Sequence, residues 1–146
     1  MASNAMKDRF NRAFTGLHKA LFKASKGKLF GKAFGMPVVM LTTTGRKSGQ
    51  PRSTMLTSPV REGDKVVLVA SYGGDDRDPA WYKNLLAEPA VEIVMSGATR
   101  KMTARTATAD EKAALWPQVV AAYKGYAGYQ TKTDRDIPLV ILEPAV

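Results

Sequence analysis

Three short runs of β-branched and apolar residues follow one another in the centre of the chain, with connections between them too short to hold a helix. The runs are VVMLTTT at 38–44, the segment 52–60, and VVLVAS at 66–71. β-Branched residues bounded by turn-forming residues are typical of strands. Strands joined by such short connections must be antiparallel, because a parallel crossover needs roughly a dozen residues or more. The centre of the chain is therefore predicted to form an antiparallel meander.

The rest of the chain adds more strands and two helices. A short helix is expected at 79–87, where Asp78 is the predicted N-cap. A second is expected at 108–123, because it opens on a Thr-x-x-Glu capping box, and Pro117 should kink it. The remaining predicted strands are 91–96 and 99–107, which form a hairpin, and the closing strand 137–144. The fold class is thus mainly β with flanking helices: about six antiparallel strands closed into a small barrel without free edges.

The first 35 residues differ from the domain predicted at 36–146. MASNA, before Met6, is interpreted as a cloning remnant. Residues 7–24 carry apolar residues at steps of three and four, which predicts an amphipathic helix. Residues 7–35 hold eight Lys or Arg and one Asp, and so carry +7 of the net charge of +9. This charge favours contact with an anionic membrane surface or another polyanion, and solubility is the alternative explanation.

Composition excludes several classes of protein. The 146 residues contain no Cys and a single His, so a disulfide framework and a Cys- or His-based metal site are not expected. No apolar run approaches the roughly 20 residues of a membrane span. No signal peptide is visible either, and the predicted location is the cytoplasm. The length favours one domain with a core of its own.

The turn at 45–51 is rich in cations and glycine. Its glycines allow backbone conformations that point several N–H groups at one anion. A guanidinium at the start of the following strand can bind a phosphate with two hydrogen bonds. A Walker phosphate loop is excluded, because a strand and not a helix follows. The alternative is a solvated hairpin tip. The candidate anion-binding residues are Gly45, Arg46, Lys47, Ser48 and Arg52.

Aromatic residues gather in three further segments. ASYGG at 70–74 ends a buried strand in small residues, so that a planar ligand could approach the backbone. The short helix at 79–87 carries Trp81, Tyr82 and Asn84. Tyr123, Tyr126 and Tyr129 follow at intervals of three, with glycines between them. Each group could simply be core, but tyrosines beside glycines also suit the wall of a binding cleft.

These segments together resemble one known family. TTTGRKSGQPR, ASYGG, DPAWYKNL and WPQVVAAYKGYAGYQTKTDRDIPLVILEP are similar, in this order, to the deazaflavin-dependent nitroreductases, also described as F420H2-dependent quinone reductases. The similarity covers about residues 36–144. It implies a split β-barrel of the FMN-binding type that binds coenzyme F420. It also implies hydride transfer from the reduced deazaflavin to quinone-like, nitroaromatic or other activated unsaturated acceptors.

The resemblance assigns roles to the candidate residues. Those of the turn would hold the phosphodiester and acidic tail of the coenzyme. Ser71 and the backbone of 69–71 would lie against the deazaflavin ring, with Trp81 and Asn84 nearby. The three tyrosines would line the acceptor pocket, and Ser71 or a tyrosine hydroxyl, Tyr126 first among them, could protonate or stabilise the developing anion. Two pocket positions depart from the family's usual residues: Thr57, where relatives often have an aromatic ring, and Tyr72, where they often have lysine.

Two other functions are compatible with parts of the sequence. A split-barrel oxidoreductase or binding protein could use FMN or haem instead of the deazaflavin. A small basic barrel could bind nucleic acid, but strands with exposed aromatics interleaved with Lys and Arg, which base stacking requires, are missing. The expected partner is therefore a small-molecule electron acceptor and not nucleic acid. Its identity and the oligomeric state are left open.

Overall fold

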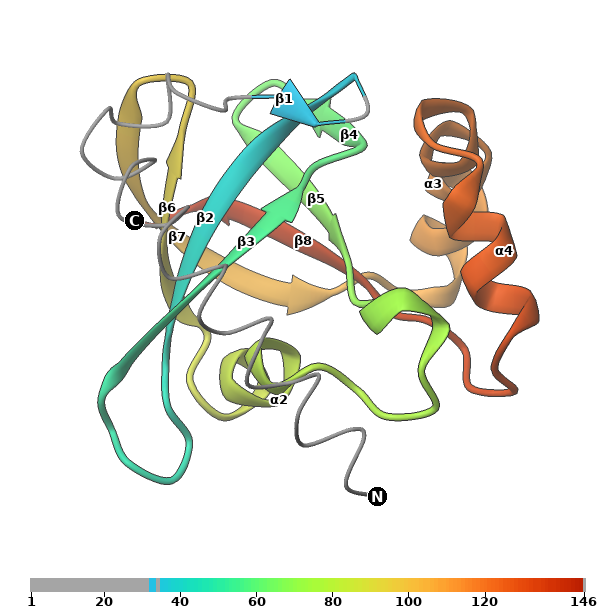
Figure 1. The fold of residues 1–146 in the computed structure, drawn as a ribbon. Helices are drawn as coiled ribbons and strands as arrows, with labels where there is room; N and C mark the ends of the chain where they lie inside the picture. The colour runs from blue at the N-terminus through green and yellow to red at the C-terminus, as the bar shows by residue number, and fades with distance from the viewer. Residues whose placement is uncertain (1–31, 34, 146) are drawn as a thin grey trace.

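Eight antiparallel strands form one sheet in a computed structural model that describes residues 32–33 and 35–145 (Figure 1). The predicted meander, hairpin and closing strand are confirmed, with ends shifted by at most two residues except in the segment 52–60. The strands are β1 Lys32–Ala33, β2 Met36–Thr44, β3 Pro51–Thr57, β4 Val60–Glu62, β5 Lys65–Val69, β6 Ala90–Met95, β7 Ala98–Thr106 and β8 Leu139–Pro144. Their order is β1-β2-β6-β7-β8-β5-β4, and β3 also pairs with β2.

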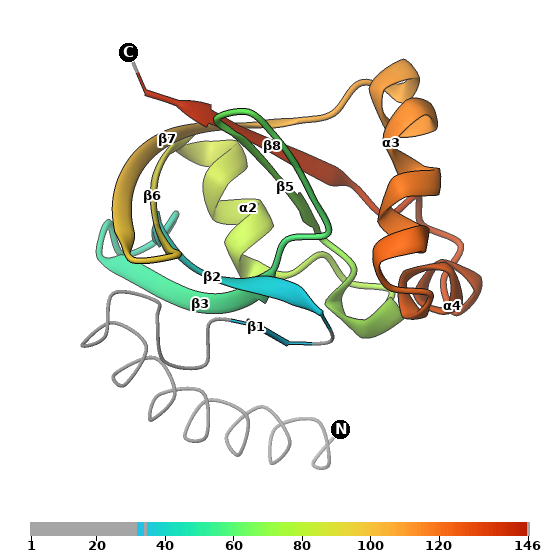
Figure 2. The ribbon, with the colours of Figure 1, turned by 90° about the horizontal axis from the view of Figure 1, so that it is seen from above.

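The sheet curves around a common interior and forms a split β-barrel (Figure 2). The chain runs directly from β3 into β4, but no ladder joins these two strands within the described residues. Apolar side chains from every long strand except β3 alternate into the interior, and Leu56 of β3 packs against them. The fully buried members include Val39, Leu41, Leu68, Ile93 and Leu142. The predicted fold class is confirmed.

The predicted strand 52–60 is in fact two strands, separated at Ser58 and Pro59. Pro59 has no N–H to donate to a ladder. The Ser58 side chain is fully buried, and its hydroxyl lies 3.0 Å from the carbonyl oxygen of Val60 and 2.8 Å from that of Val67. The hydroxyl therefore ties the corner between β3 and β4 to β5. This break, together with β1, accounts for the difference between about six strands and eight.

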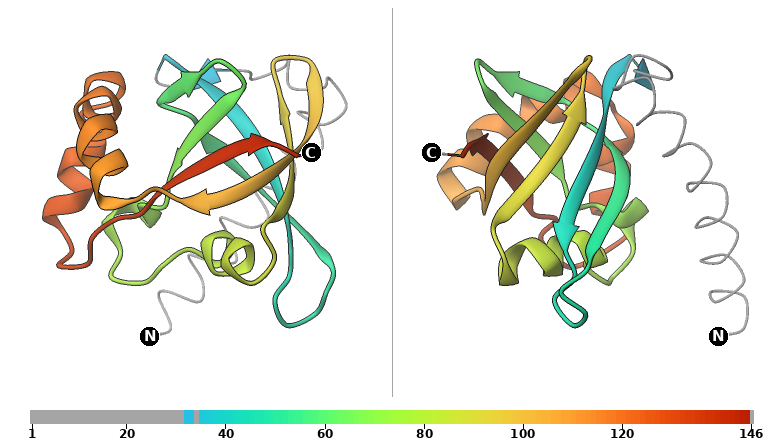
Figure 3. Two further views of the ribbon diagram at one scale, coloured as in Figure 1. Left: turned by 180° about the vertical axis from the view of Figure 1, so that it is seen from behind. Right: turned by 90° about the vertical axis from the view of Figure 1, so that its left-hand side faces the viewer.

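Helix α2, Ala80–Ala87, covers one end of the barrel (Figure 3). Trp81, Tyr82 and Leu85 pack into the interior from this helix. The predicted N-cap was wrong: Pro79 occupies that position, and no side chain caps the helix. Asp78 instead forms an ion pair with Arg135 at 3.1 Å, and a carboxylate engaged by a guanidinium is not free to accept from the first turn of a helix.

Helices α3, Ala109–Ala122, and α4, Gly125–Thr131, pack beside the outer face of β5 and β8 (Figure 1). The capping box at the start of α3 is confirmed, and the helix continues unbroken through Pro117. The predicted helix was one residue too long, because α3 ends at Ala122 and Tyr123 is extended at φ −156° and ψ 110°. A Cβ atom at Gly125 would lie 2.3 Å from the Tyr123 ring, so the glycine lets this ring fold across the start of α4.

Residues 1–31 lie outside the described part of the chain, and with them the predicted cloning remnant and the helix at 7–24. The domain boundary at 35/36 stays a prediction. Pairing of β1 with the start of β2 begins at Lys32. Among the described residues, no helix has the length and hydropathy needed to cross a bilayer.

Candidate functional site

The turn between β2 and β3 projects from one side of the barrel (Figure 1). We call residues 45–52 the basic turn. Two hydrogen bonds of 2.8 Å shape it: Gly45 N–H donates to the Gln50 carbonyl, and Gly49 N–H donates to the Gly45 carbonyl. Gly49 has a φ of +71°, which favours glycine. At Gly45 a Cβ atom would lie 2.7 Å from the Ser48 hydroxyl. Both predicted glycines are therefore required by the turn itself.

The cations of the basic turn have no acidic partner among the described residues. Arg46, Lys47 and Arg52 form no ion pair with any carboxylate of residues 35–145. The Arg52 guanidinium is exposed but oriented, because its Nη2 donates to the Ser48 hydroxyl at 3.3 Å. The same hydroxyl accepts from Gln50 N–H at 3.2 Å. The turn thus presents three uncompensated positive charges on a short, braced loop, an arrangement that attracts anions.

Asn84 connects the basic turn to α2. Its Oδ1 accepts from Arg46 twice, from the backbone N–H at 3.2 Å and from Nη1 at 3.0 Å. Its Nδ2 donates to the Thr43 hydroxyl at 3.1 Å. Asn84 is buried, as is Trp81, which packs into the barrel interior. Asn84 and Trp81 are thus predicted coenzyme-binding residues that lie beneath the surface. Asn84 holds Arg46 in place through its two hydrogen bonds.

Ser71 begins a tight turn after β5. We call residues 71–74 the serine turn. Tyr72, Gly73 and Gly74 have φ values of 46°, 64° and 83°, all in the left-handed region. Such backbone is strained for tyrosine and is found most often at functional sites. The Ser71 carbonyl accepts from Gly74 N–H at 2.9 Å. The serine turn is therefore a tight backbone segment of unusual conformation, at the place where the resemblance expects the ring.

The three predicted tyrosines contact one another and form what we call the tyrosine cluster. The ring centroids lie 5.3 Å apart for Tyr123 and Tyr126, 6.3 Å for Tyr123 and Tyr129, and 6.1 Å for Tyr126 and Tyr129. Tyr126 is buried at 6 % exposure, while the other two are half-buried. The Tyr126 hydroxyl hydrogen-bonds with that of Thr57 at 3.0 Å. Thr57 therefore contacts the cluster, and its place in an acceptor pocket stays a prediction.

The surroundings keep two of these tyrosines protonated. Burial raises the pKa of Tyr126, while the bond with Thr57 opposes this and the neighbouring Tyr123 adds to it. For Tyr129, the hydrogen bond with Tyr123 raises the pKa most, followed by burial. Since an ordinary tyrosine pKa is already about 10, both hydroxyls keep their protons at neutral pH. They can therefore serve as hydrogen-bond or proton donors.

The candidate residues fall into two groups. The serine turn contacts the tyrosine cluster, because a Cβ atom on Gly74 would lie only 2.8 Å from the Tyr129 carbonyl oxygen. The basic turn lies on the opposite side of the barrel from α4 in both Figure 1 and Figure 2. Strand β3 connects the two groups, running from Pro51 in the basic turn to Thr57 at the cluster. Seven residues of strand span roughly 20 Å, and the two groups therefore flank an elongated surface.

Sequence reasoning missed one residue that contacts this site. Arg135 donates from Nη2 to the Ser71 carbonyl at 2.9 Å. It lies in the segment TKTDRDIP, among acidic residues and just before a buried strand. Only that placement, an arginine beside a core strand, could have drawn attention to it, and nothing local distinguishes it from a solvated surface charge.

Comparison with known proteins identifies the family of the chain. Residues 15–144 match the family model described as F420H(2)-dependent quinone reductase. The F420H(2)-dependent quinone reductase Rv1261c of Mycobacterium tuberculosis is 40% identical over 131 residues, which are 86% of this chain and 87% of that protein.

Two solved structures are also similar. An F420-H2 dependent reductase, FDR-A, is 44% identical with a TM-score of 0.67, over 73% of this chain and 94% of that one. A protein described as a domain-swapped dimer is 35% identical with a TM-score of 0.69, over 98% of this chain and 100% of that one. The family match and the 40% identity both extend over most of the chain. The chain therefore belongs to the F420H(2)-dependent quinone reductase family.

Proposed function

We propose that the protein is an oxidoreductase that transfers hydride from F420H2 to a quinone-like, nitroaromatic or other activated unsaturated acceptor. The observation that carries this proposal is the placement of two features at opposite ends of β3. The basic turn, whose cations have no acidic partner among the described residues, lies at one end, and the tyrosine cluster with the adjoining serine turn lies at the other. A ligand with a planar ring and a long anionic tail fits this arrangement, and F420 has both. The relatives' names support the same donor and the same class of acceptor.

The basic turn would hold the tail of the coenzyme. Arg52, oriented by Ser48, can bind a phosphate oxygen with two N–H groups. Arg46 is fixed through Asn84. Lys47 is exposed and adds charge without a fixed direction, which suits a flexible run of carboxylates.

The serine turn and the tyrosine cluster would hold the ring and the acceptor. Ser71 and the backbone of 69–71 supply the surface for the ring, and Trp81 supports this region from inside the barrel. Tyr123, Tyr126 and Tyr129, with Thr57, line the acceptor side. Tyr72 is 43% exposed at the edge of the serine turn, where a change of residue would alter which acceptors fit.

The chemistry divides between coenzyme and protein. The reduced deazaflavin, when bound, supplies the hydride. The protein orients the two reactants by proximity. A tyrosine hydroxyl or Ser71 donates a proton or hydrogen bond to the acceptor oxygen on which negative charge develops.

Donor selectivity tests the proposal. Steady-state assays with menadione should show oxidation of F420H2, while NADPH and FMNH2 should be inactive as donors. Equal rates with FMNH2 would contradict it and favour the FMN alternative.

A peripheral membrane contact is a further part of the proposal. It is supported by the apolar stripe and cations of residues 7–24 in the sequence. The inner face of the cell membrane is the corresponding cytoplasmic location. Co-sedimentation with liposomes should rise with the fraction of anionic lipid and disappear when residues 1–24 are deleted. If co-sedimentation does not depend on the fraction of anionic lipid, residues 7–24 have another role.

A further inference from the structure

One guanidinium holds the loop that contains the serine turn. Arg135 Nη2 donates to the Ala70 carbonyl at 3.1 Å and to the Ser71 carbonyl at 2.9 Å. Its Nε donates to the Asp75 carbonyl at 2.9 Å, and its Nη1 to Asp78 Oδ1 at 3.1 Å. The four acceptors lie before, within and after the serine turn. Arg135 therefore closes this loop across its base.

The chemistry of this contact requires arginine. The Arg135 side chain is 16% exposed, so most of it is buried and hydrogen-bonded to protein atoms instead of water. Three nitrogens in one rigid plane reach four oxygens that face different directions. A lysine ammonium is a single point on a flexible stem and cannot bridge them. Carbonyls beside left-handed residues have few regular partners, and the guanidinium supplies them.

The backbone of Arg135 is itself fixed to the tyrosine side of the site. Gln130 of α4 donates from Nε2 to the Arg135 carbonyl at 2.8 Å. Arg135 N–H donates to the Thr133 hydroxyl at 3.2 Å. Helix α4 carries Tyr126 and Tyr129. One residue thus links the helix of the tyrosine cluster to the serine turn.

We propose that Arg135 is a positioning residue for the reaction: it holds the serine turn at a fixed height against α4, so that coenzyme ring and acceptor meet face to face. This inference rests on the proposed function, because the ring is expected at the serine turn. Arg135 need not touch either reactant. Its loss should release the 70–78 loop and weaken binding of the coenzyme, while the barrel stays folded.

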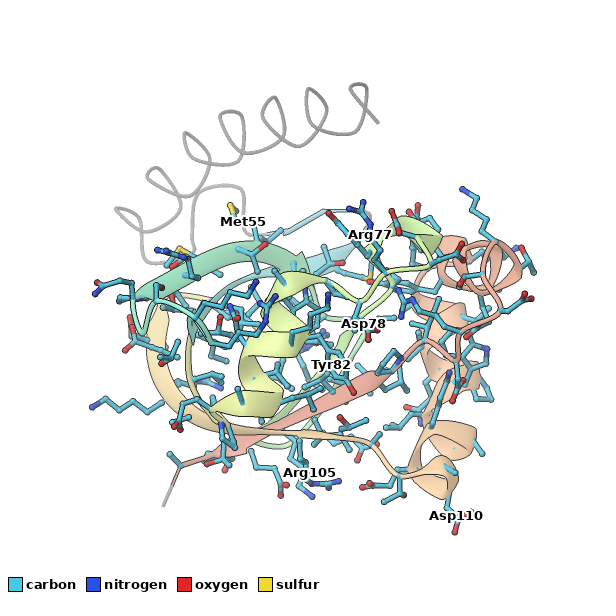
Figure 4. All side chains as sticks on the ribbon, turned by 90° about the horizontal axis from the view of Figure 1, so that it is seen from below. Met55, Arg77, Asp78, Tyr82, Arg105 and Asp110 are labelled. Carbon is cyan, nitrogen blue, oxygen red and sulfur yellow. The ribbon has the colours of Figure 1, made fainter. Side chains whose placement is uncertain are left out.

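Arg77 provides the matched control. It belongs to the same loop, but its side chain is 51% exposed. It binds the neighbouring Asp75 carboxylate at 3.0 Å and lies over the Tyr72 ring, 5.3 Å from the ring centroid, so these contacts stay within the loop. Figure 4 shows Arg77 at the rim of the molecule and Asp78 further in, near α2. The test variants are Arg135→Lys and Asp78→Asn; the second removes the carboxylate charge and leaves a neutral, weaker hydrogen bond at one of the four contacts.

Two measurements decide the proposal. The first, amide hydrogen exchange of the ligand-free protein, should become faster at residues 70–78 in Arg135→Lys, with β6 and β7 unchanged and Arg77→Gln like wild type. The second is F420 affinity by calorimetry: it should fall about tenfold in Arg135→Lys, about threefold in Asp78→Asn, and less than twofold in Arg77→Gln.

Each outcome has a defined meaning. Wild-type affinity for F420 in Arg135→Lys would overturn the proposal, since lysine keeps the charge and loses only the geometry. If Arg135→Lys does not fold, Asp78→Asn decides by the same criterion. If wild type itself does not bind F420, the proposed function fails, and hydrogen exchange alone then decides whether Arg135 holds the serine turn. Unchanged exchange at 70–78 would overturn that as well.

Discussion

A single hydrogen bond complicates the role of the tyrosine predicted first as proton donor. Tyr126 is the most buried member of the cluster, and its hydroxyl is already engaged by Thr57. Removal of this hydroxyl therefore breaks a structural bond as well as any contact with the acceptor. A partner variant that breaks the same bond from the other side separates the two effects.

Tyr126→Phe should lower turnover with quinone by at least about tenfold, and at most by the 10² to 10³ typical of a lost transition-state donor. Thr57→Val, which removes the same bond and keeps the Tyr126 hydroxyl, should stay within about twofold. Both variants should bind F420 like wild type. Steady-state kinetics with menadione check this. Equal losses of turnover in the two variants would mean that the Tyr126 hydroxyl acts only through its hydrogen bond with Thr57 and is not a proton donor.

In the basic turn, orientation should matter as much as charge. Arg52→Ala is expected to weaken F420 binding about tenfold, the lower part of the range for charge-assisted hydrogen bonds because the group is exposed. Lys47→Ala should cost about threefold, since no described residue fixes its direction. Calorimetry at two salt concentrations should show both effects shrinking at high salt. The control is Arg100→Ala, which removes an exposed cation on β7. A similar loss of F420 affinity in this variant would indicate nonspecific electrostatic attraction.

At the scale of elements, two glycines of α4 offer a matched comparison. A Cβ atom at Gly125 would lie 2.3 Å from the Tyr123 ring, whereas at Gly128 it would meet nothing within 4 Å. Gly125→Ala should therefore displace the Tyr123 ring, lower Tm and raise the apparent KM for quinone. Gly128→Ala should raise stability by up to about 1 kcal/mol through helix propensity. Thermal unfolding and kinetics check both, and an unchanged KM in Gly125→Ala would remove Tyr123 from the pocket wall.

Most strands were predictable because their signals are local. Alternating and β-branched runs with short turns gave the hairpins, and the Thr108–Glu111 capping box marked the start of α3. The end of α3 was not predictable, because it depends on how the Tyr123 ring packs across Gly125. The corner at Ser58 was missed for a similar reason: its hydroxyl bonds to Val67 of another strand.

The candidate site divides in the same way. The basic turn could be found because its glycines and cations are adjacent in sequence. Arg135 could not, since its partners Ala70, Asp75 and Asp78 lie 65, 60 and 57 residues away. The predicted N-cap at Asp78 failed because of that same distant guanidinium. Long-range polar contacts of this kind leave no periodic pattern in a single sequence.

At the scale of the whole molecule, Arg105 of β7 joins α3 to β8. It bonds Glu111 at 2.6 and 2.9 Å and Glu143 at 2.7 Å. Figure 4 shows Arg105 at the surface below the barrel strands. The hydrogen bond from Arg105, followed by that from Thr108 N–H, lowers the pKa of Glu111 from 4.5 to about 2.

This shift predicts a pH-dependent stability. A depressed carboxyl pKa stabilises the folded state above the unfolded value of 4.5, and the stabilisation is lost as pH falls toward about 2. Glu111→Gln keeps a capping-box residue and removes the titrating charge. Its Tm should lie below that of wild type at neutral pH, and the difference should close between pH 4.5 and 2. A difference that persists at the acid end would show that the Arg105 ion pair is not its source.

The position of β8 has a consequence for how the chain folds as it is made. This strand, Leu139–Pro144, lies between β5 and β7, so the β4–β5 hairpin has no ladder to the β6–β7 hairpin until it is inserted. Every proposed coenzyme-binding residue, from Gly45 to Asn84, is translated well before that moment. A nascent chain stalled before residue 139 would carry all of these residues, but its core would be incomplete and exposed. We expect such a chain to bind chaperones and not F420. We therefore expect F420 binding to report on the insertion of β8, and chains of increasing length should acquire it abruptly once residues 139–144 can pair with β5 and β7.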